Sequence, residues 1–186
     1  MKSIGFKEWA IVCQALGDGQ QTVILRKGGI AEGRDGFAFR YPEFFLFPTF
    51  FHEQIEKTRL PGAIVPQANE SQVEIRFFAR MEHGCRIESW ETAEALENFH
   101  VLKKSVVRER FDDARAPGIH IAFVRVFRLG QSWILPNEGS YAGCRSWVQL
   151  PDPPATMELE PVLNDSEFAE TEKRFLDAIG NVALRA

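Results

Sequence analysis

The sequence is poor in aromatic side chains that can form hydrogen bonds: it has 2 tyrosines against 16 phenylalanines in 186 residues. Phenylalanine rings cannot donate a hydrogen bond, so we expect most of them to fill a packed interior rather than a stacking surface. The length suits one domain with a sizeable core. We expect a single domain over residues 1–186, in which residues 151–186 form a connector and a C-terminal helix that packs on the rest.

Cysteines are few and far apart. Cys13, Cys85 and Cys144 make an odd count with no close pair, which suits reduced thiols in a cytoplasm better than a disulfide framework. The first residues lack the apolar run of a signal peptide, and no apolar stretch approaches the ~20 residues of a membrane-spanning helix. We therefore expect a cytoplasmic protein with no membrane partner, and the sequence does not indicate its oligomeric state.

Positive charge is not in excess either. Lysine and arginine together number 22 against 26 aspartates and glutamates, which gives a formal net charge of -4. A protein with this balance is not coated in positive charge. Contact with nucleic acid would therefore need a local basic patch.

Sequence motifs that hold metal ions or phosphate groups are also missing. His83 and Cys85 are the only close pair of candidate metal ligands, and without C-x-x-C or H-E-x-x-H spacing we expect no metal site. Arg26-Lys27-Gly28-Gly29 lacks the Walker spacing, and no G-x-G-x-x-G joins a strand to a helix. We therefore expect no cofactor.

The sequence does contain both helical and strand periodicities, which together predict an α+β domain. Apolar residues three or four apart predict a helix over residues 6–16, although this segment could instead pair with residues 22–26 through a Gly17-Asp18-Gly19 turn. The other expected helices cover residues 91–99, 105–111 and 164–179, the last with a capping box of Asn164 and Glu167. The expected strands cover residues 22–26, 37–41, 44–47, 72–81, 119–129, 133–135 and 146–150.

Two cationic, glycine-containing runs are candidates for a binding surface. Arg26-Lys27-Gly28-Gly29 follows a buried strand, and Gly143-Cys144-Arg145-Ser146-Trp147 combines a small-residue turn, a fixed cation and a large aromatic ring. Cations beside glycines can present charge and free N–H groups to one anion, although solvated turns have the same composition. Cys144 could be a nucleophile beside Arg145, or a small packed residue.

Two other groups of charged residues each allow more than one interpretation. Arg125 shares an expected strand face with Ile121 and Phe123, so it must meet an acidic partner, backbone carbonyls or an anionic ligand. The expected helices over residues 91–99 and 105–111 separate acidic from basic residues. This separation fits a solvated surface as well as a phosphate-binding ridge.

The chain resembles a bacterial family known as domain of unknown function 1802. The resemblance rests on four runs that span most of the chain: Phe6-Lys7-Glu8-Trp9-Ala10, Leu25-Arg26-Lys27-Gly28-Gly29-Ile30, Phe45-Leu46-Phe47-Pro48-Thr49 with His52, and Gly143-Cys144-Arg145-Ser146-Trp147. The family has no established activity. The association of some members with Mrr-type restriction endonuclease domains implies a link to restriction or nucleic-acid defence.

A more distant resemblance is to ASCH domains, which belong to the PUA-like barrel superfamily and carry the signature G-x-K-x-x-E-x-R. Gly19 and Arg26 match this signature, whereas Gln21 stands where the lysine would be and Ile24 where the glutamate would be. This resemblance implies a PUA-like fold. The two replaced positions put the amide-hydrolysing activity of some ASCH proteins in doubt for this chain.

We therefore expect an α+β fold, a PUA-like (ASCH-like) curved β-barrel with flanking helices. The expected function is a non-catalytic module that binds nucleic acid or a modified nucleotide, with arginines on phosphate and Trp147 or Phe51 stacking a base. The expected ligand-binding residues are Arg26, Lys27, Thr49, His52, His100, Arg110, Arg145, Ser146 and Trp147. The alternatives are a small-molecule hydrolase or transferase that uses Cys144 or a histidine, and a structural partner protein.

Overall fold

The structure, a computed structural model, describes residues 3–27, 37–60, 69–112 and 117–184. Its strands are β1 (Ile4–Trp9), β2 (Val23–Lys27), β3 (Glu43–Thr49), β4 (Gln72–Ile87), β5 (Ile119–Pro136), β6 (Trp147–Gln149) and β7 (Leu159–Pro161). Its α-helices are α1 (Ala10–Gly17), α2 (Trp90–Ala95), α3 (Lys104–Asp112) and α4 (Asp165–Ile179). Short 3₁₀ helices are η2 (His52–Lys57), η3 (Glu97–Phe99) and η4 (Gly139–Tyr141).

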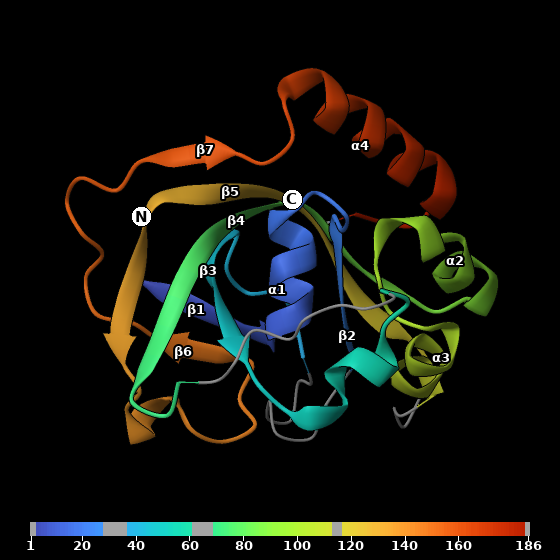
Figure 1. Cartoon of the computed structure of the whole chain (residues 1–186). Helices are drawn as coiled ribbons and strands as arrows, with labels where there is room; N and C mark the ends of the chain where they lie inside the picture. The colour runs from blue at the N-terminus through green and yellow to red at the C-terminus, as the bar shows by residue number, and fades with distance from the viewer. Residues whose placement is uncertain (1–2, 28–36, 61–68, 113–116, 185–186) are drawn as a thin grey trace.

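The described strands form one sheet in the order β2-β5-β4-β3-β1-β6, and β7 also pairs with β5. β1 and β3 run parallel, while the other neighbours are antiparallel. The sheet curves around α1, which lies on its concave side (Figure 1). The expected α+β class and curved sheet are confirmed.

The sheet is not closed into a barrel, and in this respect the expectation is corrected. In the part of the chain that the structure describes, no backbone ladder joins the edge strands β2 and β6. The two edges nevertheless approach each other, because Nε of Arg26 donates a hydrogen bond to Oγ of Ser146 at 3.2 Å. A side-chain bond therefore stands where a closed barrel would have backbone pairing.

Apolar side chains cover both faces of the sheet. On β3, Phe44 and Leu46 belong to a core on the α1 side, while Phe45 and Phe47 belong to a second core on the opposite side. Successive strand residues point to opposite faces, so a strand between two cores is apolar at every position. This explains why the run over residues 44–47 contains no polar residue.

The three strands expected to share one sheet do so, as β2, β4 and β5. β4 and β5 are 16 and 18 residues long, and residues 133–135 continue β5 instead of forming a strand of their own. Phe77, Ile121 and Phe123 were expected to share the interior, and all three lie in the core on the α1 side.

The C-terminal helix α4 is anchored to β5 by contacts along its length and begins with an N-terminal cap. Asn164 and Glu167 form the expected capping box, with hydrogen bonds of 3.0 and 3.1 Å between side chain and backbone. Phe175 stacks on Phe123 with ring centroids 4.5 Å apart. Arg125 meets an acidic partner, Asp165 at the start of α4. None of the described helices has the length and apolar character needed to cross a membrane.

Two local predictions are wrong. Residues 6–9 belong to β1, and the helix begins only at Ala10. Phe6 is fully buried on a strand that pairs with β3 and β6, so tertiary pairing overrides the helical spacing of the apolar residues. Residues 37–41 form no strand, and Phe37 packs edge to face on Phe39 at 4.9 Å.

Gly17, the last residue of α1, packs directly against Phe77 of β4. A Cβ atom at this position would lie 2.0 Å from the ring of Phe77, which is only 3% exposed. We predict that Gly17→Ala lowers the free energy of unfolding by about 1–3 kcal/mol, the usual cost of overpacking a core. Urea denaturation measures this difference.

Gly139→Ala is the matched control, since no atom lies within 4 Å of the Cβ that it would add. We expect this control to change the free energy of unfolding by less than about 0.5 kcal/mol. Equal stabilities of the two variants would contradict the close packing of α1 on β4.

Candidate functional site

Segments that are far apart in the sequence meet where β1 and β3 end. The two strands are paired in parallel, so Glu8 and Trp9 lie beside Pro48 and Thr49. Nζ of Lys7 donates a hydrogen bond to the carbonyl of Gly143 at 3.0 Å, and Arg26 holds Ser146. Residues 143–146 are thereby fixed to both β1 and β2.

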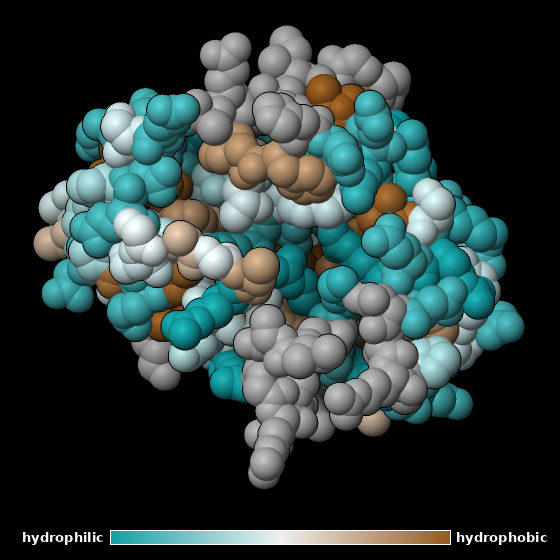
Figure 2. Space-filling view, turned by 90° about the horizontal axis from the view of Figure 1, so that it is seen from below, coloured by the Kyte–Doolittle hydropathy of each residue, from teal (hydrophilic) through white to brown (hydrophobic). Residues whose placement is uncertain are grey.

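Figure 2 views the molecule from the side toward which β3 runs in Figure 1. Hydrophilic side chains dominate this face and surround a hollow near its centre. The described ends of β1 and β3 therefore lie toward a polar side of the molecule.

Three charged side chains at this end of the sheet are buried: Lys7, Glu8 and Arg110 are 6%, 1% and 9% exposed. Arg110 donates a hydrogen bond to the carbonyl of Leu25 at 2.7 Å, and its guanidinium lies 4.5 Å from the ring centroid of Trp9. Burial lowers the pKa of Arg110, while the nearby Glu8 carboxylate acts in the opposite direction. The carboxylate therefore stabilises a guanidinium that is withdrawn from water.

The surroundings of Lys7 lower the pKa of its ammonium group. Burial is the main cause that lowers its pKa, the Cys144 thiolate opposes this shift, and the Arg26 guanidinium adds to it. Lys7, Arg26 and Cys144 are therefore close enough to influence one another's charge. A charged ammonium that is withdrawn from water and faces another cation is stabilised when an anion binds beside it.

The hydrogen bonds of Thr49 and Gln54 join β1, β3 and α1 next to these charged residues. Oγ1 of Thr49 donates to the carbonyl of Glu8 at 3.0 Å. Gln54, which is fully buried, donates to the carbonyl of Thr49 at 2.6 Å and accepts from the N–H of Ile11 at 3.2 Å. The N-cap residue of α1, Trp9, makes no side-chain capping bond, so the amide of Gln54 satisfies one of the N–H groups in the first turn.

The structure distributes the other predicted site residues differently. Lys27, Cys144 and Arg145 are exposed beside the cluster, whereas Ser146 is buried. Trp147 is half-buried and packs against Phe6, Tyr41 and Phe44 with centroid distances of 4.8, 5.0 and 5.3 Å. His52 lies in η2; the side chain of His52 and the predicted positions Gly28, Gly29 and Ile30 lie outside what the structure describes.

His100 is a buried, neutral histidine. It is 4% exposed, and its Nδ1 accepts a hydrogen bond from the N–H of Leu102 at 3.1 Å. Burial, followed by the charges of Arg59 and Arg110, lowers its pKa from 6.5 to about 3. The ring therefore has a structural hydrogen bond and no charge at neutral pH.

Sequence reasoning missed Lys7, Glu8 and Gln54 as members of the site. The helix predicted over residues 6–16 assigned Lys7 and Glu8 to helix positions among apolar residues, although they belong to a buried strand. The signal that could have revealed them is the adjacent pair of opposite charges within an otherwise apolar run. Gln54 carried no comparable signal, because one amide in a polar segment is ordinary.

Potential metal ligands are not gathered at this site. Within residues 3–27, 37–60, 69–112 and 117–184, no three His, Cys, Asp or Glu side chains are grouped so that they could hold a metal ion. His83 instead lies 2.7 Å from Glu172 on α4, measured between Nε2 and Oε1, and Cys85 is buried.

The fold and the site together define a mixed α+β protein with a curved, open sheet and a partly buried cluster of cations at the ends of its strands. The chain belongs to the family described as Domain of unknown function (DUF1802), whose model matches residues 5–174. A comparison with curated proteins finds no match.

Three solved structures of ASCH from Zymomonas mobilis are similar to this structure. The ASCH structure without a stated substitution is 12% identical, with a TM-score of 0.43, and the match covers 92% of this chain and 94% of that chain. A serine-to-alanine variant is 12% identical with a TM-score of 0.44 and coverages of 92% and 95%. A tyrosine-to-phenylalanine variant is 14% identical with a TM-score of 0.43 and coverages of 93% and 98%.

The neutral state of His100 makes stability depend on pH. A histidine in the unfolded chain takes up a proton near pH ~6.5, whereas His100 in the folded protein does so only at about 3. Stability is therefore lost as the pH falls through the window between these two values. In the variant His100→Gln, the side-chain carbonyl can still accept the hydrogen bond from the N–H of Leu102. We predict that, within this window, the variant loses about 1.4 kcal/mol less of its unfolding free energy per pH unit than the wild type does.

Urea denaturation of both proteins at several pH values between about 6.5 and 4.5 measures this difference in slope. The free energy of unfolding of the wild type is expected to fall more steeply than that of the variant. Parallel slopes would show that His100 takes up its proton equally in the folded and unfolded states.

Proposed function

We propose that this protein is a non-catalytic module that binds a phosphate-bearing ligand, either nucleic acid or a nucleotide. Its binding surface is a basic cluster that consists of Lys7, Arg26, Lys27, Arg110 and Arg145. The hydrogen bond from Arg26 to Ser146 carries the proposal, because it joins two cationic runs that are 120 residues apart in the sequence. Chain connectivity then puts Lys27 beside Arg26 and Arg145 beside Ser146.

Arg26 is suited to hold a phosphate group. Its Nε is used by Ser146 and its guanidinium lies 5.5 Å from the ring centroid of Phe6, so the orientation of the group is fixed. Its terminal nitrogens form no hydrogen bond with other described residues. A fixed guanidinium with two free terminal nitrogens matches the bidentate geometry of phosphate oxygens.

Lys7 and Arg110 support the binding of an anion from within the protein. Lys7 as a residue is 6% exposed, and its pKa is lowered, first because of burial. A bound phosphate would offset the burial of this charge, so ligand binding and protonation of Lys7 reinforce each other. Arg110 is committed to Leu25 and Trp9 and contributes its positive field instead of a direct contact.

An aromatic ring near the basic cluster is available for base stacking. Phe51 is half-buried and meets Trp9 edge to face at 4.9 Å. Trp147, the other candidate, is enclosed by four aromatic neighbours. We therefore assign the stacking role to Phe51, from the edge of the cluster that adjoins β1 and η2.

The proposal predicts salt-dependent binding of short oligonucleotides despite the negative net charge. Fluorescence anisotropy with labelled single- and double-stranded DNA and RNA at low salt measures this binding. Arg26→Gln and Arg145→Gln are each expected to weaken it by about tenfold, as the loss of one charge-assisted phosphate contact would do. A link to restriction or defence would require DNA to be among the ligands.

Lys173→Gln is the matched control, because Lys173 is an exposed cation on α4, far from the cluster. This variant should bind like the wild type. The absence of any oligonucleotide binding at low salt would contradict the proposal. Equal weakening of binding by Arg26→Gln, Arg145→Gln and Lys173→Gln would contradict it as well. A collapse of the melting temperature in Arg26→Gln would instead mark Arg26 as a structural cation.

A second candidate function, covalent catalysis by Cys144, has one specific observation in its favour. Cys144 is exposed, whereas Cys13 and Cys85 are buried. Burial raises the pKa of Cys13 and raises that of Cys85 to about 11. Cys144 also lies within electrostatic reach of Lys7.

This alternative predicts that iodoacetamide alkylates Cys144 well below pH ~8, faster than it alkylates a free cysteine derivative. Mass spectrometry after timed labelling gives the rate for each cysteine. Lys7→Met should slow the reaction, because it removes the neighbouring positive charge. A rate equal to that of the free thiol, or a rate unaffected by Lys7→Met, would leave Cys144 without nucleophilic activation.

A further inference from the structure

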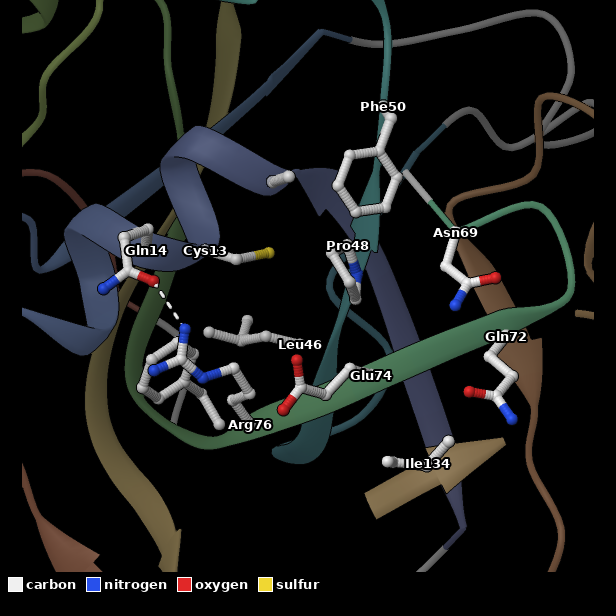
Figure 3. A pocket seen from close by; sticks show the side chains of 12 residues that line it. Cys13, Gln14, Leu46, Pro48, Phe50, Asn69, Gln72, Glu74, Arg76 and Ile134 are labelled. Atoms are coloured by element: carbon white, nitrogen blue, oxygen red, sulfur yellow. Dashed lines mark hydrogen bonds between the residues drawn. The ribbon is translucent and has the colours of Figure 1, made fainter. Parts of the chain in front are cut away.

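A cavity of about 280 Å³ opens between α1, the end of β3 and the first half of β4 (Figure 3). Its lining contains none of the residues of the basic cluster. Ala10, Cys13 and Gln14 of α1 form one wall, and strand residues form the floor. The cavity is therefore a separate candidate site.

The floor of this cavity is polar because of an irregularity in β4. The pairing of β4 with β5 shifts register between Ile75 and Phe77. Beyond this point Phe77 and Ala79 face the core on the α1 side, whereas before it Val73 and Ile75 face the opposite core. The alternate residues before the shift are consequently turned toward the α1 side.

Those alternate residues are Gln72 and Glu74, and Arg76 follows at the shift itself; all three are exposed. They occupy the face of the sheet that is apolar in the rest of β4. α1 does not cover them, so this part of the concave face remains open. A polar recess next to a hydrophobic core is the usual form of a small-molecule site.

Glu74 and Arg76 place opposite charges in the same recess. The two residues lie on either side of Ile75 in β4, with the register shift at Arg76, and both line the cavity. Nη1 of Arg76 donates to Oε1 of Gln14 at 3.0 Å, which fixes the guanidinium and leaves its other donors available. Glu74 has no hydrogen bond or ion pair with other described residues. Figure 3 shows both side chains pointing into the cavity, with Leu46 between them.

Apart from Gln14 and Asn69, the other residues that line the cavity are apolar or weakly polar. Leu46 and Pro48 of β3 line it together with Phe50 and Ile134. Phe50 and Ile134 are 36% and 55% exposed, which is unusual for large hydrophobic side chains in this structure. A ligand with an apolar group would remove part of this surface from water.

We propose that this cavity binds a free α-amino acid with an apolar side chain. The ammonium group of the ligand bonds to Glu74, its carboxylate bonds to Arg76, and its side chain packs on Leu46, Pro48 and Phe50. One carbon carries both charged groups of an amino acid, so the ligand bridges the spacing of Glu74 and Arg76 with hydrogen bonds of ordinary length, roughly 2.7–3.2 Å. The volume of about 280 Å³ accommodates a ligand of this size. This site goes beyond the proposed phosphate-binding function, and neither depends on the other.

The test uses L-leucine as the probe and the methyl resonances of Leu46 and Ile134 as reporters in NMR titrations of the full chain. The expected result is a saturable shift of both signals, with a dissociation constant of about 1 mM or below. No saturable shift in the low millimolar range would overturn the proposal. Saturable shifts confined to residues outside the cavity would overturn it as well.

Two leucine derivatives that each lack one charge separate the roles of Glu74 and Arg76. Leucinamide keeps the ammonium, so its binding should be weakened about tenfold by Glu74→Gln and little by Arg76→Gln. N-acetyl-leucine keeps the carboxylate and should show the reverse pattern. The crossed pattern is a result that general loss of folding cannot produce.

Glu170→Gln is the matched control, since Glu170 is an exposed carboxylate on α4 outside the cavity. It should leave the binding of all three probes unchanged. If Glu74→Gln weakens leucinamide no more than Glu170→Gln does, the ammonium does not bind at Glu74 and the proposal fails. Thermal melts of each variant verify that a folded protein is being titrated.

Discussion

The parallel pairing of β1 with β3 is the constraint on which the rest of the site depends. β1 lies inside the sheet between β3 and β6, and its residues from Ile4 to Glu8 are all buried. A strand in this position is normally apolar throughout, yet it contains Lys7 and Glu8. The apolar contacts of Phe6 with its aromatic neighbours fix the strand. Because the strand is fixed, Lys7 and Glu8 are held in buried positions that a charged side chain does not adopt by itself.

Hydrogen bonds around this strand make the cluster rigid before any ligand arrives. Gln54 joins the end of β3 to the start of α1, and Thr49 joins β3 to the end of β1. Arg26 and Lys7 hold the segment before β6 in the same way. Groups that are already held in place lose little conformational freedom on binding, so more of their interaction with a ligand contributes to affinity.

The sequence was sufficient for features that depend on local chemistry. The capping box at Asn164, the alternation along β4 and the apolar run of β5 each predict an element that the structure contains. The composition also marked the two cationic runs as candidates for a binding surface, and the hydrogen bond from Arg26 to Ser146 joins them.

Features set by distant contacts could not be predicted in this way. Residues 6–9 have the spacing of a helix and become a strand only because β3 and β6 are there to pair with them. The cavity beside α1 depends on a register shift near Ile75, for which the sequence contains no glycine or proline as a marker. The position of Gln54 likewise follows from how η2 folds back toward α1.

The place of β1 in the sheet also sets the order in which the protein can fold. Gly5 pairs with Phe45 on one side and with Val148 on the other, so the second contact closes a loop of most of the chain. Loops of this length are costly in entropy and long-range strand pairing is slow. During synthesis, β1 must wait for residues 147–149 to leave the ribosome before its second edge can be paired. The hydrogen bond between Arg26 and Ser146 therefore forms late in folding, and partly folded chains lack the complete cluster of cations.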